Sequence, residues 1–237
     1  MPGTAVSPQK PTRALVVSAA VAAVGLAGAF AMAAGRRIGR WGASEEEVAR
    51  PLPGDDEVPN PGIASTRAIS IHAPTQVVWP WLVQMGWGRA GWYSYDRIDN
   101  DCLPSAERII PELQGLKVGD FVPEGAEAGW TVSALEPDRL LLLAAHAPMK
   151  GVDWVERRDS SWLFLLDEEG PEHTRLVERA RTSLTVNERT LLGRLLATRL
   201  GMRLLAAGDF VMARRHMLGI TRRAERDWRE SSRRDLC

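Results

Sequence analysis

Cysteine and net charge are both scarce in this chain of 237 residues, and each scarcity excludes a class of function. Cys102 and Cys237 stand far apart, with no CxxC pair and no histidine at ligand spacing. They give no case for zinc and only a weak one for a disulfide. Positive and negative side chains balance to a net charge of zero, so no bulk field favours nucleic acid and we expect no nucleic-acid partner.

Recognisable catalytic motifs are absent too. The sequence has no nucleophile elbow, P-loop, dinucleotide fingerprint or Ser-His-Asp arrangement. Its four histidines share no motif, and only His216 is notable, because it stands beside Met217 on an expected helix. The polar run from Asp96 to Asp101 lacks the spacing of a calcium loop, so turn and capping roles are favoured there. We expect no metal and no cofactor, and binding rather than catalysis.

One long uncharged stretch stands near the start of the chain. Ala14 to Gly35, as a helix, would span about 33 Å, which is enough for the hydrocarbon core of a bilayer. A cleaved signal peptide is the alternative, because Ala31-Met32-Ala33 offers an A-x-A site. The length of the stretch and the arginines just beyond it favour a retained transmembrane helix over residues 14–35, after a tail of residues 1–13. We expect a single-pass protein of the cell membrane, with its domain on the cytoplasmic side.

Residues 36–63 have the composition of a linker. Four prolines and six acidic side chains fall between Trp41 and Gly62, as is typical of an extended spacer. We expect this segment to hold the domain away from the bilayer. The globular domain would then occupy residues 64–228, followed by a C-terminal tail of residues 229–237.

The aromatic residues gather between Trp79 and Asp101, which hold six of the chain's nine tryptophans and two tyrosines taken together. Gly86, Gly88 and Gly91 interrupt them, so the stretch cannot be one regular helix or strand. Clustered tryptophan and tyrosine suit the wall or rim of a pocket. A corner of the core in which these rings merely pack is the alternative.

Local patterns across the domain predict an α+β fold. Alternation over residues 66–72 indicates a strand with one buried face, and an apolar face from Val77 to Met85 indicates a helix that Pro80 ends or kinks. Residues 105–113 suit a short helix or turn. Further strand-like segments at about ten-residue spacing indicate an antiparallel sheet. These segments are 120–123, 129–135, 140–145, 161–166 and 174–182.

The last fifty or so residues are helix-forming and contain no proline. Asn187 is placed to cap a leucine-rich helix, and Gly208 with Asp209 suggests a break and a fresh cap. A second helix is then expected from about Phe210 to Trp228, with an apolar face at helical spacing.

Three strings resemble a known superfamily: APTQVVWPWLVQMGWGRAGWYSYD at 73–96, PELQGLKVGD at 111–120 and FVMARRHMLGITRRAE at 210–225. They look like bacterial START-like (SRPBCC) proteins, of the polyketide cyclase/dehydrase and lipid transport type, whose activity is unassigned. The resemblance covers about residues 64–226. It implies a helix-grip fold, in which an antiparallel sheet wraps around a long C-terminal helix. It also implies a cavity for an apolar or aromatic small molecule, and it carries no catalytic residues.

We therefore expect a membrane-tethered binding module for a hydrophobic small molecule or lipid. A polyketide cyclase- or aromatase-like enzyme that uses the same cavity is the alternative, and an interaction domain with a filled cavity is a third reading. The candidate pocket residues are the aromatic, apolar and polar side chains nearest the expected cavity: Trp81, Trp87, Trp92, Tyr93, Tyr95, Asp96, Arg108, Trp130, Trp162, Phe210, Met217 and Ile220.

The chain from Asn187 onward is basic, with twelve arginines against six acidic residues. On the cytoplasmic side, these arginines would face an anionic leaflet. The leucine-rich helix from Leu191 to Leu205 would add an apolar contact. The alternative is a solvated helix face whose arginines pair with Glu225, Asp227 and Glu230.

Overall fold

The computed structural model of this chain describes residues 37–126, 128–149 and 152–234. The expected transmembrane helix at residues 14–35 lies outside the described residues. Within the described ranges, no helix combines the length and the apolarity needed to cross a bilayer. Residues from Ile38 onward form one compact unit.

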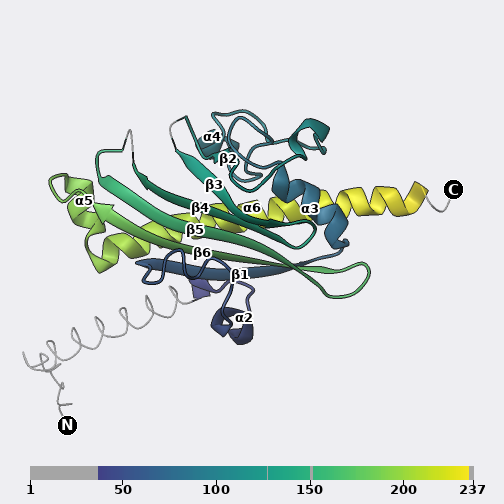
Figure 1. The fold of residues 1–237 in the computed structure, drawn as a ribbon, viewed down its shortest axis with the longest axis horizontal. Coiled ribbons are helices and arrows are strands. Elements are labelled where there is room, and N and C mark those ends of the chain that lie inside the picture. Colours follow the sequence, from purple (N-terminus) through teal and green to yellow (C-terminus); the bar gives the residue numbers. More distant parts are fainter. Residues whose placement is uncertain (1–36, 127, 150–151, 235–237) are drawn as a thin grey trace, which may run out of the picture. The chain divides into compact units, whose positions relative to one another are not determined.

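An antiparallel sheet of six strands, in the order β1-β6-β5-β4-β3-β2, forms the body of this unit (Figure 1). Its strands are β1 (Ile63–Ile71), β2 (Phe121–Pro123), β3 (Gly129–Glu136), β4 (Leu140–Pro148), β5 (Val155–Glu168) and β6 (Thr174–Val186). The expected antiparallel sheet is confirmed. β5 extends at both ends, and β6 at its last residues, beyond the segments that indicated them, because the flanking residues continue the same ladder.

The described helices are α2 (Glu45–Ala49), α3 (Thr75–Val83), α4 (Asp96–Asp99), α5 (Leu191–Leu196) and α6 (Arg199–Arg234), with a 3-10 turn at Pro111–Leu113. Figure 1 shows α6 crossing one face of the sheet, with α3 beside it. α3 ends three residues after Pro80, so the missing N–H of the proline falls near the helix end. The α+β architecture with a long C-terminal helix is confirmed.

The long terminal helix differs from the expectation in one respect. α6 runs for 36 residues and passes through Gly208 without a break. Glycine inside a helix costs about 1 kcal/mol relative to alanine, and packing of the apolar face on the sheet offsets this. Asp209 does not cap a helix, because its carboxylate accepts a hydrogen bond from Arg67 instead. The break lies earlier, between α5 and α6, and α5 is capped by Thr190 rather than by Asn187.

The main core lies between the sheet, α3 and α6. Trp81 of α3, Phe164 of β5, and Met217 and Ile220 of α6 are fully buried there. Burying a side chain of this size contributes about 1.5–3 kcal/mol. This cluster therefore holds α6 against the sheet.

The segment 38–62 is not the extended spacer expected from its composition, because it packs on the sheet. Trp41 lies at the edge strand β1 and contacts α6, and residues from α2 onward pack on the other face. α2 is closed by a capping box and contributes Glu47, whose carboxylate pairs with Arg175 of β6. Asp55 pairs in the same way with Arg179 of β6. Two of the six acidic residues that suggested a solvated linker, Glu47 and Asp55, are thus the partners of arginines on the outer face of β6. Alternation alone could not decide which face those arginines occupy.

Candidate functional site

A cavity of about 380 Å³ lies between α6 and the sheet face that α6 covers. Its floor follows from strand pairing, because Ser65, Ala180 and Trp162 are register partners on β1, β6 and β5. Most of its lining is apolar or aromatic. These lining residues are Ile63, Trp92, Trp130, Met149, Trp154, Val155, Trp162, Ala180, Leu184, Leu205, Met212 and Ala213.

Three tryptophans from distant parts of the chain meet at this cavity. The ring of Trp92 stacks on Trp162 with centroids 5.4 Å apart, and Trp130 lies 5.5 Å from Trp162. The indole N–H of Trp130 is buried and has no hydrogen-bond partner among the described residues. Such rings offer a large apolar area with one polar handle each. The aromatic wall can therefore hold an apolar ligand and donate a hydrogen bond at its edge.

Backbone geometry in the loop after α3 directs Trp92 to the cavity. Gly91 adopts a φ of 77°, and a Cβ there would lie 2.4 Å from the Oγ of Ser105. Only glycine fits such a position. The next residue but one, Tyr93, has a φ of 56° and its hydroxyl donates to the backbone oxygen of Trp81 in the core. The adjacent residues Trp92 and Tyr93 thus face different surroundings, Trp92 the cavity and Tyr93 the core.

His216 borders the same cavity from α6, within a box of aromatic rings. Its Nδ1 lies 2.5 Å from the backbone oxygen of Trp92, so Nδ1 carries the proton and donates. Nε2 then keeps its lone pair, and it has no partner among the described residues. Burial lowers the pKa of His216 to about 4; the charge of Arg223 acts in the same direction and the Trp92 carbonyl opposes it. The imidazole is therefore neutral at physiological pH.

Charged side chains lie at the edges of the cavity. The guanidinium of Arg158 stands 4.5 Å from the ring centroid of Trp130 and donates to Glu124 at 2.5 Å. Asp99 of α4 also borders the cavity, and burial followed by the charge of Asp96 raises its pKa. These groups can orient a ligand whose body lies against the tryptophans.

Arg158, Glu124 and the His216–Trp92 hydrogen bond were not predicted as site features from the sequence. A signal for Arg158 exists in the strand pattern. Trp162, Ser160 and Arg158 alternate along β5, so identifying Trp162 as a cavity residue places the other two on the same face. Glu124 follows β2 in a turn, and nothing in its local sequence marks it.

A buried ion pair lies on the sheet beside the cavity. Arg67 of β1 and Glu178 of β6 face each other in the register and lie 3.2 Å apart, each about 1% exposed. Arg67 also donates to Asp209 of α6, at 2.6 Å, and Asp209 borders the cavity. Burial raises the pKa of Glu178, and the charge of Arg67 opposes that shift. These three side chains tie α6 to the sheet.

Of the predicted pocket residues, Trp92, Trp130 and Trp162 line the cavity. Trp81, Met217 and Ile220 are fully buried in the adjoining core and do not line it. Phe210 is half-buried and packs edge-on against Trp41 of the N-terminal segment, with ring centroids 6.4 Å apart. The partner of Phe210 could not be foreseen while residues 36–63 were expected to be a spacer.

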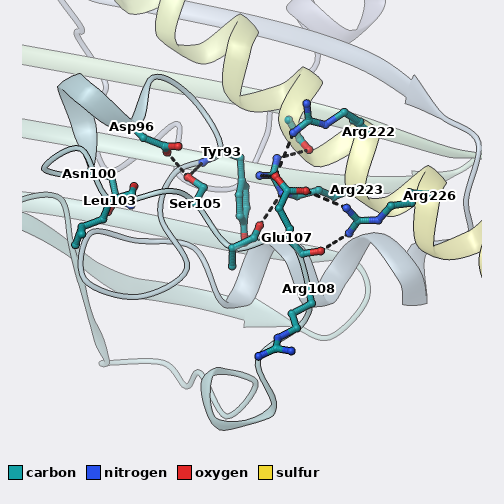
Figure 2. A network of polar contacts seen from close by, with 12 residues as sticks. Tyr93, Asp96, Asn100, Leu103, Ser105, Glu107, Arg108, Arg222, Arg223 and Arg226 are labelled. Atoms are coloured by element: carbon teal, nitrogen blue, oxygen red, sulfur yellow. Dashed lines mark hydrogen bonds and ion pairs between the residues drawn. The ribbon is translucent and has the colours of Figure 1, made fainter.

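The other predicted residues belong to different surroundings. Tyr93 and Asp96 border a second, polar pocket of about 240 Å³. Trp87 is half-buried and its indole N–H donates to Asp101, while Tyr95 is exposed. Arg108 is exposed and points away from the neighbouring polar network in Figure 2.

That polar network is centred on Glu107, which accepts hydrogen bonds from Arg222, Arg223 and Arg226 of α6 (Figure 2). Arg223 is buried and also donates to the backbone oxygen of Ala106. Because these groups satisfy one another, the network acts as a clamp between residues 105–108 and α6. We assign it a structural role.

No family model matches the sequence, and no curated protein does either. Among solved structures, a Mesorhizobium loti protein is 15% identical with a TM-score of 0.40, over 68% of this chain and 97% of that one. The Zhui aromatase/cyclase from a Streptomyces species is 13% identical with a TM-score of 0.33, over 69% of this chain and 94% of that one. A START superfamily protein from Mycobacterium smegmatis is 10% identical with a TM-score of 0.33, over 66% of this chain and 99% of that one.

Proposed function

We propose that this protein binds a hydrophobic small molecule or a lipid in the cavity between α6 and the sheet, without chemical change to the ligand. The observation that carries the proposal is the cavity itself. Its volume of about 380 Å³ lies in the range of small-molecule sites, and its wall is mostly apolar with a few polar groups. The pair of Arg158 and Glu124 at the edge of the cavity supplies those polar groups.

Filling the cavity should weaken binding. Ala180→Leu places a larger side chain on the floor, opposite Trp162 in the register. We expect affinity for an apolar fluorescent probe such as Nile red to fall by about tenfold or more, which corresponds to about 1.4 kcal/mol. A titration of probe fluorescence against the full chain in detergent measures this change.

The matched control is Ala134→Leu, which makes the same substitution at a partly buried alanine that packs on the other apolar cluster of the sheet. It should leave probe affinity within about twofold, whatever it does to stability. Equal loss of binding in both variants, or none in either, would place the probe outside this cavity.

The state of His216 favours a second candidate, an enzyme of the cyclase or aromatase type. A general base must be unprotonated at the working pH, and the neutral imidazole with a free Nε2 lone pair meets that requirement. A ligand would have to displace surrounding rings to reach Nε2, because this atom is enclosed. Liquid chromatography with mass spectrometry of a bound ligand over time distinguishes the two candidates, because cyclisation gives an isomer with a new retention time, dehydration lowers the mass by one water, and a binder changes neither.

We also propose that the N-terminal segment tethers the protein to a membrane, on the strength of its 14–35 composition. The full chain should then remain with membranes after an alkaline carbonate wash, whereas a chain beginning at Arg37 should be soluble and folded. A later start would remove Trp41, whose backbone oxygen accepts from Ala68 of β1. Recovery of a mature chain beginning at Ala34 would show a cleaved signal instead.

A further inference from the structure

An exposed surface of leucines and arginines covers α5 and the first turns of α6. Leu191 is 81% exposed, Leu200 62% and Leu204 58%. We call this region the leucine–arginine surface, and it comprises Leu191, Leu192, Leu195, Leu200 and Leu204 with Arg189, Arg194, Arg199 and Arg203. Five exposed leucines within fourteen residues are far more than scattered surface apolar residues require.

The two helices are held in a tight and defined arrangement beneath these side chains. Leu196 is buried, and Gly193 and Gly201 are in close contact with backbone. A Cβ on Gly201 would lie 2.1 Å from the backbone oxygen of Leu195, and one on Gly193 would lie 2.0 Å from that of Asn187. The leucines are therefore exposed on a tightly packed junction between two helices, and their exposure does not come from a frayed helix end.

Charge divides the basic C-terminal part of the chain into two halves. From Arg189 to Gly208 there are four arginines and no acidic residue. Within the ranges that the structure covers, none of these four arginines forms an ion pair. Further along α6, by contrast, Arg226 pairs with Asp227 and Arg229 with Glu225. The paired helix face expected as one alternative thus describes only part of the second half, where Arg222, Arg223, Arg226 and Arg229 form the ion pairs.

The leucine–arginine surface adjoins one end of the cavity. Leu205 follows the last exposed leucine on α6 and lines the cavity, as does Leu184 near the end of β6. Figure 1 shows α5 and the start of α6 together beyond the end of β6, at the opposite end of α6 from the C-terminus. A partner that covers this surface would lie close to the cavity.

We propose that the leucine–arginine surface docks on a bilayer that contains anionic lipid, so that a ligand can pass between the acyl chains and the cavity. The transfer of a ligand to the cavity rests on the proposed binding function. The docking of the surface rests only on its exposed leucines and unpaired arginines. Helices that combine apolar side chains with arginines bind such interfaces through both apolar burial and charge attraction. A second copy of the chain fits less well, because four unpaired arginines on each copy would repel one another.

The test uses the full chain in lipid vesicles, with Cys102→Ser and Cys237→Ser to leave one labelling site. Leu200→Cys carries an environment-sensitive fluorophore such as NBD, and Val118→Cys, at an equally exposed apolar position outside the surface, carries the control label. On vesicles of phosphatidylcholine with phosphatidylserine, emission from position 200 should shift to the blue, and added salt should reverse the shift. Emission from position 118 should not change.

Charge variants complete the experiment. Arg194→Gln, Arg199→Gln and Arg203→Gln together should lower the ratio of docked to undocked protein by roughly fivefold for each arginine removed. Arg229→Gln with Arg233→Gln, in the second half of α6, should leave that ratio unchanged. A label at position 200 that stays in a water-like environment on anionic vesicles would overturn the proposal. A shift that follows protein concentration and ignores lipid would overturn it too, in favour of a second copy.

Docking and cavity binding can fail separately. If position 200 reports no lipid contact while Ala180→Leu still weakens probe binding in detergent, only the docking proposal is lost. If position 200 reports lipid contact while Ala180→Leu and Ala134→Leu bind the probe alike, docking stands and the cavity proposal is lost.

Discussion

Replacing Arg67 by methionine should lower the free energy of unfolding by about 3–5 kcal/mol, because it leaves the carboxylate of Glu178 buried without its charge partner. Both side chains are about 1% exposed and pair at 3.2 Å, and Arg67 also binds Asp209 of α6. The loss should grow as the pH rises. Burial already raises the pKa of Glu178, and removing the opposing charge raises it further, so the folded variant must hold a proton that higher pH removes.

Urea unfolding at several pH values measures this effect, and two comparisons make it specific. Glu136→Gln breaks the exposed pair with Arg139 and should cost less than about 1 kcal/mol. The double variant Arg67→Met with Glu178→Leu should recover part of the loss, because no buried charge is left unpaired. A loss below about 1 kcal/mol in Arg67→Met, independent of pH, would mean that the buried carboxylate of Glu178 does not depend on Arg67 as its charge partner.

Acid should destabilise the protein through His216 by about 3 kcal/mol between pH 6.5 and pH 4. The folded pKa of this histidine is about 4, against 6.5 for an ordinary histidine, and burial is the main cause. Because the folded pKa is the lower one, the stabilisation is complete above pH 6.5 and is lost as the pH falls towards 4. Each unit of pKa difference corresponds to about 1.36 kcal/mol.

Carboxyl groups titrate over part of the same range, so the test is the difference between two stability profiles. His216→Gln should show a flatter fall between pH 6.5 and pH 4 than the unaltered chain, whatever its stability at neutral pH. Parallel profiles for His216→Gln and the unaltered chain would show that the histidine is accessible to protons in the folded state.

Local sequence patterns were sufficient to predict the fold, but they did not predict which distant residues pack against one another. The alternation of β1 and the spacing of Met217 and Ile220 report local geometry, so the sheet and the terminal helix could be predicted. The role of the acidic segment around Glu47 depends on Arg175, more than a hundred residues away, and no local pattern reports such a contact. Gly208 shows the same limit, because the packing that keeps the helix continuous comes from the sheet.

The sequence predicted an apolar and aromatic cavity, but it identified only some of the residues that line it. Trp92, Trp130 and Trp162 could be proposed because large aromatic side chains suit a pocket wall. Tyr93 stands next to Trp92 but turns into the core, since its backbone has a positive φ that the sequence does not show. Strand alternation predicts that Arg158 faces the cavity only once Trp162 is known to face it.

The most direct test of the binding function is native mass spectrometry of the full chain purified in mild detergent from the cells that make it. We expect an additional mass on the folded chain, released on denaturation and recovered as an apolar or aromatic small molecule or a lipid. Ala180→Leu should carry less of it and Ala134→Leu should carry as much. A folded chain with only its polypeptide mass, which also takes up nothing from a lipid extract of the same cells, would contradict the proposed binding function.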